Sequence, residues 1–567
     1  MYLNCMVEIP ENLTGISKKT IKGTTYIYYE HGRRYDPVKK YNVPQCTTIG
    51  KQSDPDPSMM IPNSNYRKYF PDAELPEELP ESVRSACLMI GPYLVIRKVI
   101  RYYRLDEKLE DIIGKDAGLF LDLAAYAIIT ENNAGQYYPE YAYRHPLFTA
   151  DMKVYSDSKI SRFLREINRD DAIRFQNEWN EGRDHREKIY ISYDSTNKHC
   201  QAGDIRLAEF GHEKEKQKKP IYNFSMAYDR NNRIPLFYEE YPGSINDVSQ
   251  LQFLLEKAAA YGYRNAGFIL DRGYFSELNI NFMDRNQYDF LIMVKGCREL
   301  VSRIILQVRG TFEDEWDRSI PFYGVSGTTV RACILKRDEK ERFIHIYYSD
   351  YRKARERSKL ETKIQQHKEF LNRLIGSGVT VENTYTEFFE PIYYHKGKQD
   401  QKLQFVRERK DAISKAIKLC GYFAIITSSE MTASEALELY KSRDCSEKLF
   451  RGDKSYLGER SMRVYQDEPL YTKIFIEFVA LIIRNKIYMC LKDRMKATGK
   501  KANYMTVPAA IKELSKIEMV KQADGIYRLS YAVTATQKEI LQAFNISAAD
   551  VKKQAGELSG LLRTLTA

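Results

Sequence analysis

The sequence lacks the cysteine and histidine patterns of metal knuckles, disulfide frameworks and zinc enzymes. Its nine cysteines include no CxxC pair, and the closest two, Cys420 and Cys445, are 25 residues apart, so reduced, buried thiols are expected. The eight histidines form no HxH or HxxxH pair. A phosphate-cradling GxxxxGK[ST] loop is also missing, which disfavours ATP-driven chemistry.

Long hydrophobic runs are equally scarce. The longest apolar stretch, Ile474 to Ile483, is interrupted by Glu477 and is well short of the roughly 20 residues that cross a bilayer. The first residues carry no basic segment followed by an apolar core, so no export signal is predicted. We therefore expect a cytoplasmic protein with no membrane partner.

What is present is the composition of a large globular protein. Of 567 residues, 43% are hydrophobic and 29% are charged, which excludes a disordered or collagen-like chain, and the length predicts three or four domains. The net charge of +11 favours a polyanionic partner. The excess is concentrated in residues 351–420, which hold 16 Lys and Arg against 9 Asp and Glu.

The N-terminal residues 1–60 predict a small basic module that contains β-strands. Strand-like stretches at 24–30 and 46–51 lie on either side of a basic turn at 31–40. That turn fits a phosphate contact and equally fits a solvated hairpin. The polar, Pro-rich stretch 53–65 predicts a linker.

The next region predicts helices. Apolar residues recur at helical spacing over 80–182, which indicates a helical domain. Within it, the pattern of residues 156–167 favours an amphipathic helix that packs on its neighbours over a DNA-reading helix.

From residue 188 the apolar period changes to that of strands. The predicted strands are 188–196, 221–229, 234–241, 266–271 and 289–295, with a helix at 246–262 after the third strand and a short helix after the fourth. Three strands in a meander, then helix, strand, helix and strand, is the topology of the ribonuclease-H-like fold. We therefore predict an α/β protein with a ribonuclease-H-like mixed-sheet core.

The remainder of the chain predicts an insertion and the second part of that core. Charged helices are expected at 351–375 and 398–420, a strand at 421–428, a helix from Thr432, and a helix at 469–493 buried against the sheet. The predicted divisions are 186–298 and 421–495 for the two parts of the core, 299–420 for an inserted β-rich and helical domain, and 496–567 for a C-terminal helical region suited to dimerisation.

Two aspartates stand at the ends of apolar strands. Asp194 lies in ISYDST and Asp271 in FILDRGYFS. A carboxylate in such a place is costly to bury unless it meets a cation. The alternative is an aspartate that caps the following turn or helix. Because two aspartates stand at strand ends in one predicted sheet, a shared site is favoured over two separate caps.

A third element follows a capping box that starts at Thr432. Tyr440, Arg443, Glu447 and Lys454 follow at spacings of 3, 4 and 7, which on one helix places them within an arc of roughly 60°. The alternative is a solvated helix face with ion pairs such as Arg443–Glu447.

If Asp194, Asp271 and Glu447 converge, they offer three hard oxygen ligands for Mg²⁺ or Mn²⁺. Two such ions about 4 Å apart activate water or a 3′-hydroxyl for in-line attack on a phosphodiester. Arg443 and Lys454 would then face the phosphates of DNA.

These motifs together resemble the DDE transposases of the insertion-sequence-four group. They are YDST with Asp194, LDRGYFS with Asp271, and the Y-x2-R-x3-E-x6-K string from Tyr440 to Lys454, which matches the group's signature at every spacing. The 176 positions from Asp271 to Glu447 are enough to hold the β-rich insertion that the group places there. The resemblance covers about 186–495.

The resemblance implies a bacterial, nucleoid-associated endonuclease that moves an insertion sequence by cut-and-paste transposition. Such enzymes bind the terminal inverted repeats, pair the two ends through a homodimer, cut double-stranded DNA by hydrolysis and join the 3′-ends to target DNA. The N-terminal β and helical modules would bind DNA. The implied catalytic ligands of two Mg²⁺ or Mn²⁺ ions are Asp194, Asp271 and Glu447, and the implied DNA contacts are Tyr440, Arg443 and Lys454.

Two further residues and two rival functions belong with this interpretation. Lys295 ends the predicted strand 289–295 and Arg298 lies just after it; these two residues line a DNA channel or are ordinary surface charge. One rival is a metal-dependent nuclease of the same fold that cuts DNA without joining it. The other is a non-catalytic, transposase-derived DNA-binding regulator, against which the three intact acidic residues argue.

Overall fold

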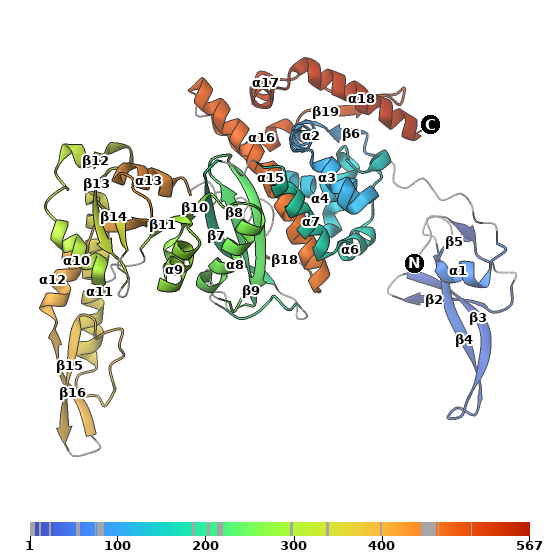
Figure 1. Cartoon of the computed structure of the whole chain (residues 1–567). Helices are drawn as coiled ribbons and strands as arrows, with labels where there is room; N and C mark the ends of the chain where they lie inside the picture. Colours follow the sequence, from blue (N-terminus) through green and yellow to red (C-terminus); the bar gives the residue numbers. More distant parts are fainter. Residues whose placement is uncertain are drawn as a thin grey trace.

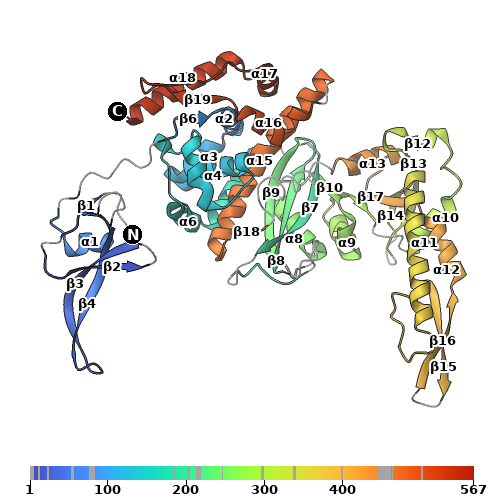
Figure 2. The ribbon, with the colours of Figure 1, turned by 180° about the vertical axis from the view of Figure 1, so that it is seen from behind.

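Figure 1 and Figure 2 show the computed structural model of the chain from two opposite sides. It describes residues 6–10, 13–21, 24–52, 57–73, 75, 84–183, 187–200, 205–211, 219–245, 247–294, 299–335, 340–396, 400–443, 461–462, 464–499 and 502–566. None of the described helices combines the length and the apolar character that a membrane crossing requires.

An antiparallel sheet with one short helix forms the N-terminal module. Its strand order is β1-β5-β4-β3-β2, and its core contains Ile27, Ile49 and Met60. The elements are β1 (Val7–Glu8), β2 (Ile16–Ile21), β3 (Thr24–Asp36), β4 (Tyr41–Gln52), β5 (Met59–Pro62) and α1 (Ser64–Tyr69). The two predicted strands are confirmed, and both run further into the basic turn than the sequence indicated.

The linker predicted at 53–65 is wrong for its described part, residues 57–65. Residues 59–62 form β5, which pairs with both β1 and β4. Asn63 caps α1 and donates a hydrogen bond from its amide to the carbonyl of Thr48. Met60 is fully buried, so the apolar MMIP segment within the Pro-rich stretch decides the structure.

The predicted helical region is confirmed as α2 to α7. The helices are α2 (Gly91–Tyr103), α3 (Leu105–Ile113), α4 (Ala117–Thr130), α5 (Tyr138–Arg144), α6 (Asp157–Glu166) and α7 (Arg169–Glu181). The side chains of Ile160, Phe163 and Leu164 on α6 are buried, which favours the packing interpretation of 156–167.

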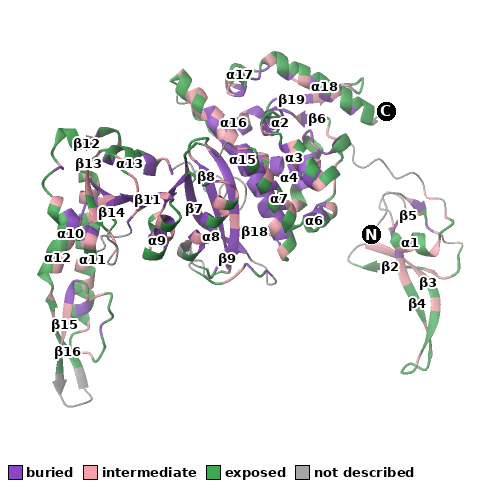
Figure 3. Ribbon diagram, viewed as in Figure 1, coloured by how far each residue is buried: buried purple, intermediate pink, exposed green. Residues whose placement is uncertain are grey.

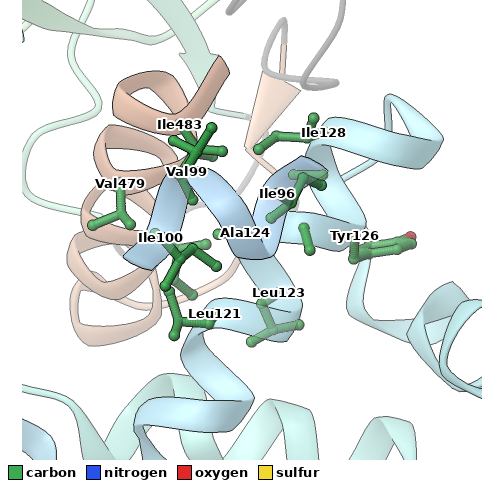
Figure 4. Close-up of a cluster of buried hydrophobic side chains, with 14 of the residues drawn as sticks. Ile96, Val99, Ile100, Leu121, Leu123, Ala124, Tyr126, Ile128, Val479 and Ile483 are labelled. Atoms are coloured by element: carbon green, nitrogen blue, oxygen red, sulfur yellow. The ribbon is translucent and has the colours of Figure 1, made fainter. Parts of the chain in front are cut away.

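The long helix α15 (Asp467–Thr498) joins this helical domain to the rest of the molecule. It packs on α2, α4 and α6 and also on β9 of the central sheet. Figure 4 shows Val479 and Ile483 of α15 within one cluster with Val99, Ile100 and Ala124. The predicted burial against the sheet is therefore correct but incomplete, because α15 also packs against helices of the helical domain.

The central sheet has ten strands of mixed direction, in the order β12-β13-β14-β17-β11-β10-β7-β8-β9, with β18 paired to β7. Its strands are β7 (Ile189–Cys200), β8 (Ile221–Asp229), β9 (Ile234–Pro242), β10 (Ala266–Leu270), β11 (Asp289–Met293), β12 (Ser319–Ile320), β13 (Val325–Cys333), β14 (Glu341–Tyr348), β17 (Tyr422–Thr427) and β18 (Ser461–Met462). The predicted order of meander, helix, strand, helix and strand is present from β7 to β11.

Helices cover both faces of this sheet. On one face, α8 (Asp247–Ala260) and α9 (Glu277–Arg285) pack against residues that include Tyr193 and Leu270. On the other face, α13 (Ala433–Lys441) packs against Ile269 and its neighbours, and α15 covers β8 and β9 around Met226. Successive strand residues therefore belong to different cores, as the two-residue period requires.

The strands predicted in 299–350 do not form a sheet of their own. After α10 (Glu299–Val308), β13 and β14 extend the central sheet, because β14 pairs with β17 and buries Ile344 and Ile346 beside it. Among the described strands of this region, only β15 (Phe389–Lys396) and β16 (Asp400–Glu408) pair separately, in an arm with α11 (Asp350–Arg373) and α12 (Lys410–Leu419). The helix predicted at 398–420 starts only at Lys410, because Leu403 faces the arm's small core from β16.

The C-terminal region contains strands as well as the predicted helices. Its elements are α16 (Val507–Leu514), β19 (Glu518–Lys521), β20 (Tyr527–Leu529), α17 (Ala535–Gln542) and α18 (Ala548–Thr566). β19 pairs with β6 (Cys87–Met89). The region is thereby joined to the helical domain near the start of the chain.

Candidate active site

Asp194 and Asp271 occupy neighbouring positions on adjacent parallel strands. Tyr193 of β7 pairs with Leu270 of β10, and each aspartate is the next residue in its chain. Asp271 continues β10 with an extended backbone, at φ −73° and ψ 162°. Adjacent strands are about 4.8 Å apart, so the two carboxylates project from one face of the sheet, between the regions covered by α13 and α15.

Both aspartates are partly exposed and accept a hydrogen bond from the next backbone N–H. The Ser195 N–H donates to Asp194 at 2.9 Å, and the Arg272 N–H donates to Asp271 at 2.7 Å. Asp271 is also the N-cap of a short 3-10 helix, Arg272–Tyr274. The capping role that the sequence left open is thus real for Asp271, and it leaves most of the carboxylate available to other partners.

Tyr440 and Arg443 converge on Asp271. The Tyr440 hydroxyl donates to Oδ1 of Asp271 at 3.4 Å, and Nη1 of Arg443 lies 3.3 Å from the same oxygen. The Arg443 guanidinium also lies 5.3 Å from the centre of the Tyr440 ring, within the range of a cation–π interaction. Only 11% of the Arg443 side chain is exposed, so this cation is held against the site.

The start of α13 is fixed by two separate interactions. The predicted capping box is present, with Thr432 and Glu435 each bonding to the other's backbone N–H. The hydroxyl of Tyr347 on β14 donates to the carbonyl of Ala433 at 2.7 Å. Burial raises the pKa of Tyr347 well above its ordinary value, so the phenol keeps its proton. These bonds hold Tyr440, two turns later, over the sheet.

The sequence predicted one helix from Thr432 to Lys454, and this prediction is wrong for residues 442 and 443, the last described before residue 461. Helix α13 ends at Lys441, with Ser442 as the C-cap, so Arg443 lies beyond the helix and reaches Asp271 from the following turn. The helical spacing was misleading because Ser442 and Arg443 form a turn instead. Glu447, Lys454, Lys295 and Arg298 lie outside the described residues.

The described chain resumes on the strand that carries Asp194. Ser461 and Met462 form β18, which pairs in parallel with β7 at His199 and Cys200. β10 pairs with β7 only as far as Tyr193, so the edge of β7 beyond Asp194 is open to this partner. Arg443, the last described residue before 444–460, therefore lies beside Asp271. Ser461, the first described residue after it, lies beside the second half of β7.

A buried ion pair anchors the same strand to α15. Lys198 of β7 and Glu477 of α15 are bonded to each other, and both side chains are fully buried. The Lys198 ammonium also lies 4.5 Å from the centre of the Phe224 ring. Because a buried charge without its partner is costly, this pair couples the position of β7 to α15.

Asp194 and Asp271 provide two hard oxygen donors of the type that Mg²⁺ and Mn²⁺ prefer. Within the described ranges, no group of three or more His, Cys, Asp and Glu side chains is arranged to hold a metal ion. Two donors fit a divalent ion that takes its remaining ligands from water, substrate or a further carboxylate.

Sequence reasoning missed one charged neighbour of the site. Arg272 is exposed and follows directly after Asp271, to which its backbone N–H is bonded. Its position in LDRGYFS was the signal available in the sequence. An exposed guanidinium at this edge has the chemistry to contact a phosphate.

Comparison with known proteins finds a family model that matches the part of the chain containing the central sheet. The family model described as the transposase DDE domain matches residues 190–483, a range that contains both aspartates and the string from Tyr440 to Lys454. No curated protein matches the sequence. A solved structure of the piggyBac transposase synaptic complex with hairpin DNA is similar at 8% identity and a TM-score of 0.36, covering 84% of this chain and 85% of that chain. That TM-score is too low to carry an argument about function.

Proposed function

Because the transposase DDE domain spans more than half of the chain, the protein belongs to the DDE transposase family, and we propose that it performs metal-dependent, cut-and-paste DNA transposition. It would cleave DNA at the ends of its element and join the freed 3′-ends to target DNA. The observation that carries this proposal is the convergence of Asp194, Asp271, Tyr440 and Arg443 at one place on the sheet. The Y-x2-R-x3-E-x6-K spacing supports assignment to the insertion-sequence-four group.

We further propose that the core is ribonuclease-H-like. The support is the strand order β9-β8-β7-β10-β11. The strands β7, β8 and β9 are antiparallel to their neighbours among these three, and β10 and β11 both run parallel to β7. Ligands of open α/β sheets bind at the carboxyl ends of parallel strands. Asp271 lies at such an end.

Asp194, Asp271 and Glu447 are proposed as ligands of two Mg²⁺ or Mn²⁺ ions. Covalent geometry limits the distance between the Cα atoms of Arg443 and Glu447 to about 14 Å, and Arg443 contacts Asp271. When bound, such ions supply activation of water or a 3′-hydroxyl and stabilisation of the leaving oxygen. The two aspartates contribute fixed negative charge on a strand pair that cannot slide without breaking the sheet.

The cations and the phenol around the aspartates are proposed to orient the DNA. Arg443 neutralises Asp271 in the structure, and it would turn to a backbone phosphate when a divalent ion takes its place. Tyr440 would hold the Asp271 carboxylate and approach the same phosphate. Lys454, Lys295 and Arg298 are proposed DNA contacts on the strength of their charge and sequence position.

The proposed partners are the terminal inverted repeats of the element, target DNA and a second copy of this chain. The region 496–567 is the proposed dimerisation region, and residues 80–182 would bind the ends. The net charge of +11 supports a polyanionic partner. A bacterial cytoplasm with nucleoid DNA is the proposed location.

The experiment uses the full chain, Mg²⁺ and a duplex that carries the inverted repeats flanking its gene. We expect cleavage at the ends and strand transfer from pre-cut ends, with both activities lost in EDTA. Asp194→Asn should abolish cleavage while binding of the ends persists. Glu277→Gln, an exposed carboxylate on α9, is the matched control and should cleave normally.

Three results would overturn parts of this proposal. Cleavage without joining would make the protein a nuclease. Specific binding with no cleavage by the wild-type chain would make it a regulator. Retained metal-dependent nicking by Asp194→Asn would remove Asp194 from the site.

A further inference from the structure

One end of the N-terminal module is a two-stranded ribbon with open edges. β2 pairs with β3 only as far as Tyr29, and β5 pairs with β4 only from Gly50. Residues 32–45, here called the basic ribbon, therefore pair only with each other among the described strands. Figure 1 shows the ribbon extending away from α1, and Figure 3 colours most of its outer part as exposed.

A structured turn closes the basic ribbon. Oδ1 of Asp36 accepts hydrogen bonds from the N–H groups of Val38 and Lys39, at 2.9 and 3.1 Å. The Lys40 N–H donates to the Asp36 carbonyl at 2.8 Å, and Lys40 takes a left-handed conformation at φ 59°. The only acidic side chain of the ribbon is therefore used within the turn, which presents two lysines at the tip.

The positive charges of the ribbon are not matched by negative ones. Arg33 pairs with Glu30 at 2.7 Å, at the base of the ribbon. Arg34, Lys39 and Lys40 are exposed and form no ion pair with any residue that the structure describes. Like charges held together on a narrow element repel one another, and a polyanion relieves that repulsion.

A comparison with α11 shows that a high content of basic residues does not by itself distinguish the basic ribbon. On that helix, Arg352 pairs with Glu356 and Arg357 pairs with Glu361, each at i,i+4 spacing. Such pairs are the ordinary arrangement of a solvated helix surface. The basic ribbon differs because its charge is concentrated and unmatched.

The size and the side chains of the ribbon fit a groove of duplex DNA. Its five paired positions below the turn, 32–36, span about 17 Å at 3.3 to 3.4 Å per residue. The major groove of B-DNA is about 12 Å wide and admits a two-stranded ribbon. Tyr35 lies opposite Asn42 on one face, and both are exposed, so that face offers an amide and a phenol to base edges.

We propose that the basic ribbon enters a groove of duplex DNA, with Arg34, Lys39 and Lys40 on the phosphates. The face with Tyr35 and Asn42 is directed at the base edges, and Arg34, which projects from the opposite face, reaches past the open edge of the ribbon to a flanking phosphate. The inference rests on the proposed function for its assumption that DNA is the substrate, but the ribbon belongs to a different sheet from the one that carries the aspartates.

The first test compares two double variants of the full chain by equilibrium binding to an end-containing duplex in EDTA. R34A/K39A removes one arginine and one lysine from the ribbon. R67A/K68A removes the same charges from exposed positions at the end of α1. We expect R34A/K39A to bind roughly tenfold or more weakly and to lose about two from the slope of log K against log salt, with R67A/K68A near wild type.

The second test uses the wild-type chain and so does not depend on a variant's folding. Lysines are acetylated with and without the duplex, and the modified positions are read by mass spectrometry. Lys39 and Lys40 should be protected by DNA, while Lys68 in the same module stays reactive.

The outcomes separate this proposal from the function on which it rests. If the wild-type chain neither binds nor cleaves DNA, the proposed function fails. If it does both while R34A/K39A is indistinguishable from wild type and Lys39 stays reactive, only the ribbon proposal is overturned. Equal loss by both double variants would also overturn it, because the module would then act only through its overall charge.

Discussion

Arg443 places a positive charge directly beside Asp271, because its Nη1 lies 3.3 Å from the Asp271 carboxylate oxygen. A divalent ion at the aspartates must compete with this guanidinium. Arg443→Ala should therefore bind Mn²⁺ more tightly in the absence of DNA, on the order of tenfold. Its DNA cleavage should fall, because a phosphate contact is lost. Calorimetric titration with Mn²⁺ and a cleavage assay measure the two effects.

Arg331→Ala is the matched control for that experiment. Arg331 forms an exposed ion pair with Glu430, so its removal should change neither Mn²⁺ binding nor cleavage. Weaker Mn²⁺ binding by Arg443→Ala would contradict the expectation and would show that the guanidinium organises the carboxylates.

Two substitutions of Tyr440 separate the contribution of its hydroxyl from the contribution of its ring. Its hydrogen bond to Asp271 is long, at 3.4 Å, so Tyr440→Phe should lower the free energy of unfolding by no more than about 1 kcal/mol and cleavage by less than roughly tenfold. Tyr440→Ala removes a buried ring and should cost about 3–5 kcal/mol. Urea unfolding and cleavage rates test both. A folded Tyr440→Phe variant without cleavage would assign the hydroxyl a direct chemical role.

The buried pair Lys198–Glu477 should show strong coupling. Glu477→Gln leaves the ammonium of Lys198 buried without its charge partner and should cost about 3–5 kcal/mol of unfolding free energy. The double variant K198M/E477L should recover most of that loss, because no charge remains buried. Denaturant unfolding of both single variants and the double variant gives the coupling energy.

An exposed ion pair provides the comparison for this cycle. Arg233 and Asp493 are bonded at 2.5 Å, but both side chains are more than 40% exposed, so Arg233→Ala should cost less than about 1 kcal/mol. If K198M/E477L were as unstable as Glu477→Gln, the cost would come from packing rather than from charge.

His345 should make the central sheet sensitive to acid. It lies fully buried on β14, with Nδ1 2.9 Å from the Thr329 hydroxyl and Nε2 2.9 Å from the Thr427 hydroxyl. Burial lowers the pKa of His345 to about 4. Between pH 6.5 and 4 the unfolded chain therefore binds a proton that the folded chain does not, and stability falls as the pH falls.

The comparison with His345→Gln isolates this effect, because glutamine does not titrate. Relative to that variant, wild type should lose about 2 kcal/mol of unfolding free energy between pH 7.5 and pH 5. Urea unfolding at the two pH values measures the difference. A constant difference between the two proteins would show that His345 titrates alike in both states.

Local pattern was sufficient for most elements of the core. The strands from β7 to β11 and the start of α13 at its capping box follow from apolar periodicity and from the pairing of Thr432 with Glu435. Pattern failed where a segment's partner is distant in sequence. Residues 57–65 look like a linker until Met60 meets the core of the N-terminal sheet, and β14 looks like part of a separate domain until it pairs with β17.

For the candidate site, too, the sequence indicated the residues but not all of their contacts. The residue types and the spacing in YDST, LDRGYFS and the Tyr440–Lys454 string indicated which side chains to examine. The approach of Arg443 to Asp271 was not predictable from helical spacing, because α13 ends at Lys441 and Arg443 reaches the carboxylate from the turn beyond it.

The sequence alone determined the kinds of element from β7 to β11, the acidic and basic residues and the family, because these depend on local periodicity and on identities at fixed spacing. Only the tertiary structure decided that Asp194 and Asp271 are neighbours, since the register between β7 and β10 joins residues 77 positions apart. Register is set by the burial of whole strand faces between helices from other parts of the chain, and no short segment contains that information.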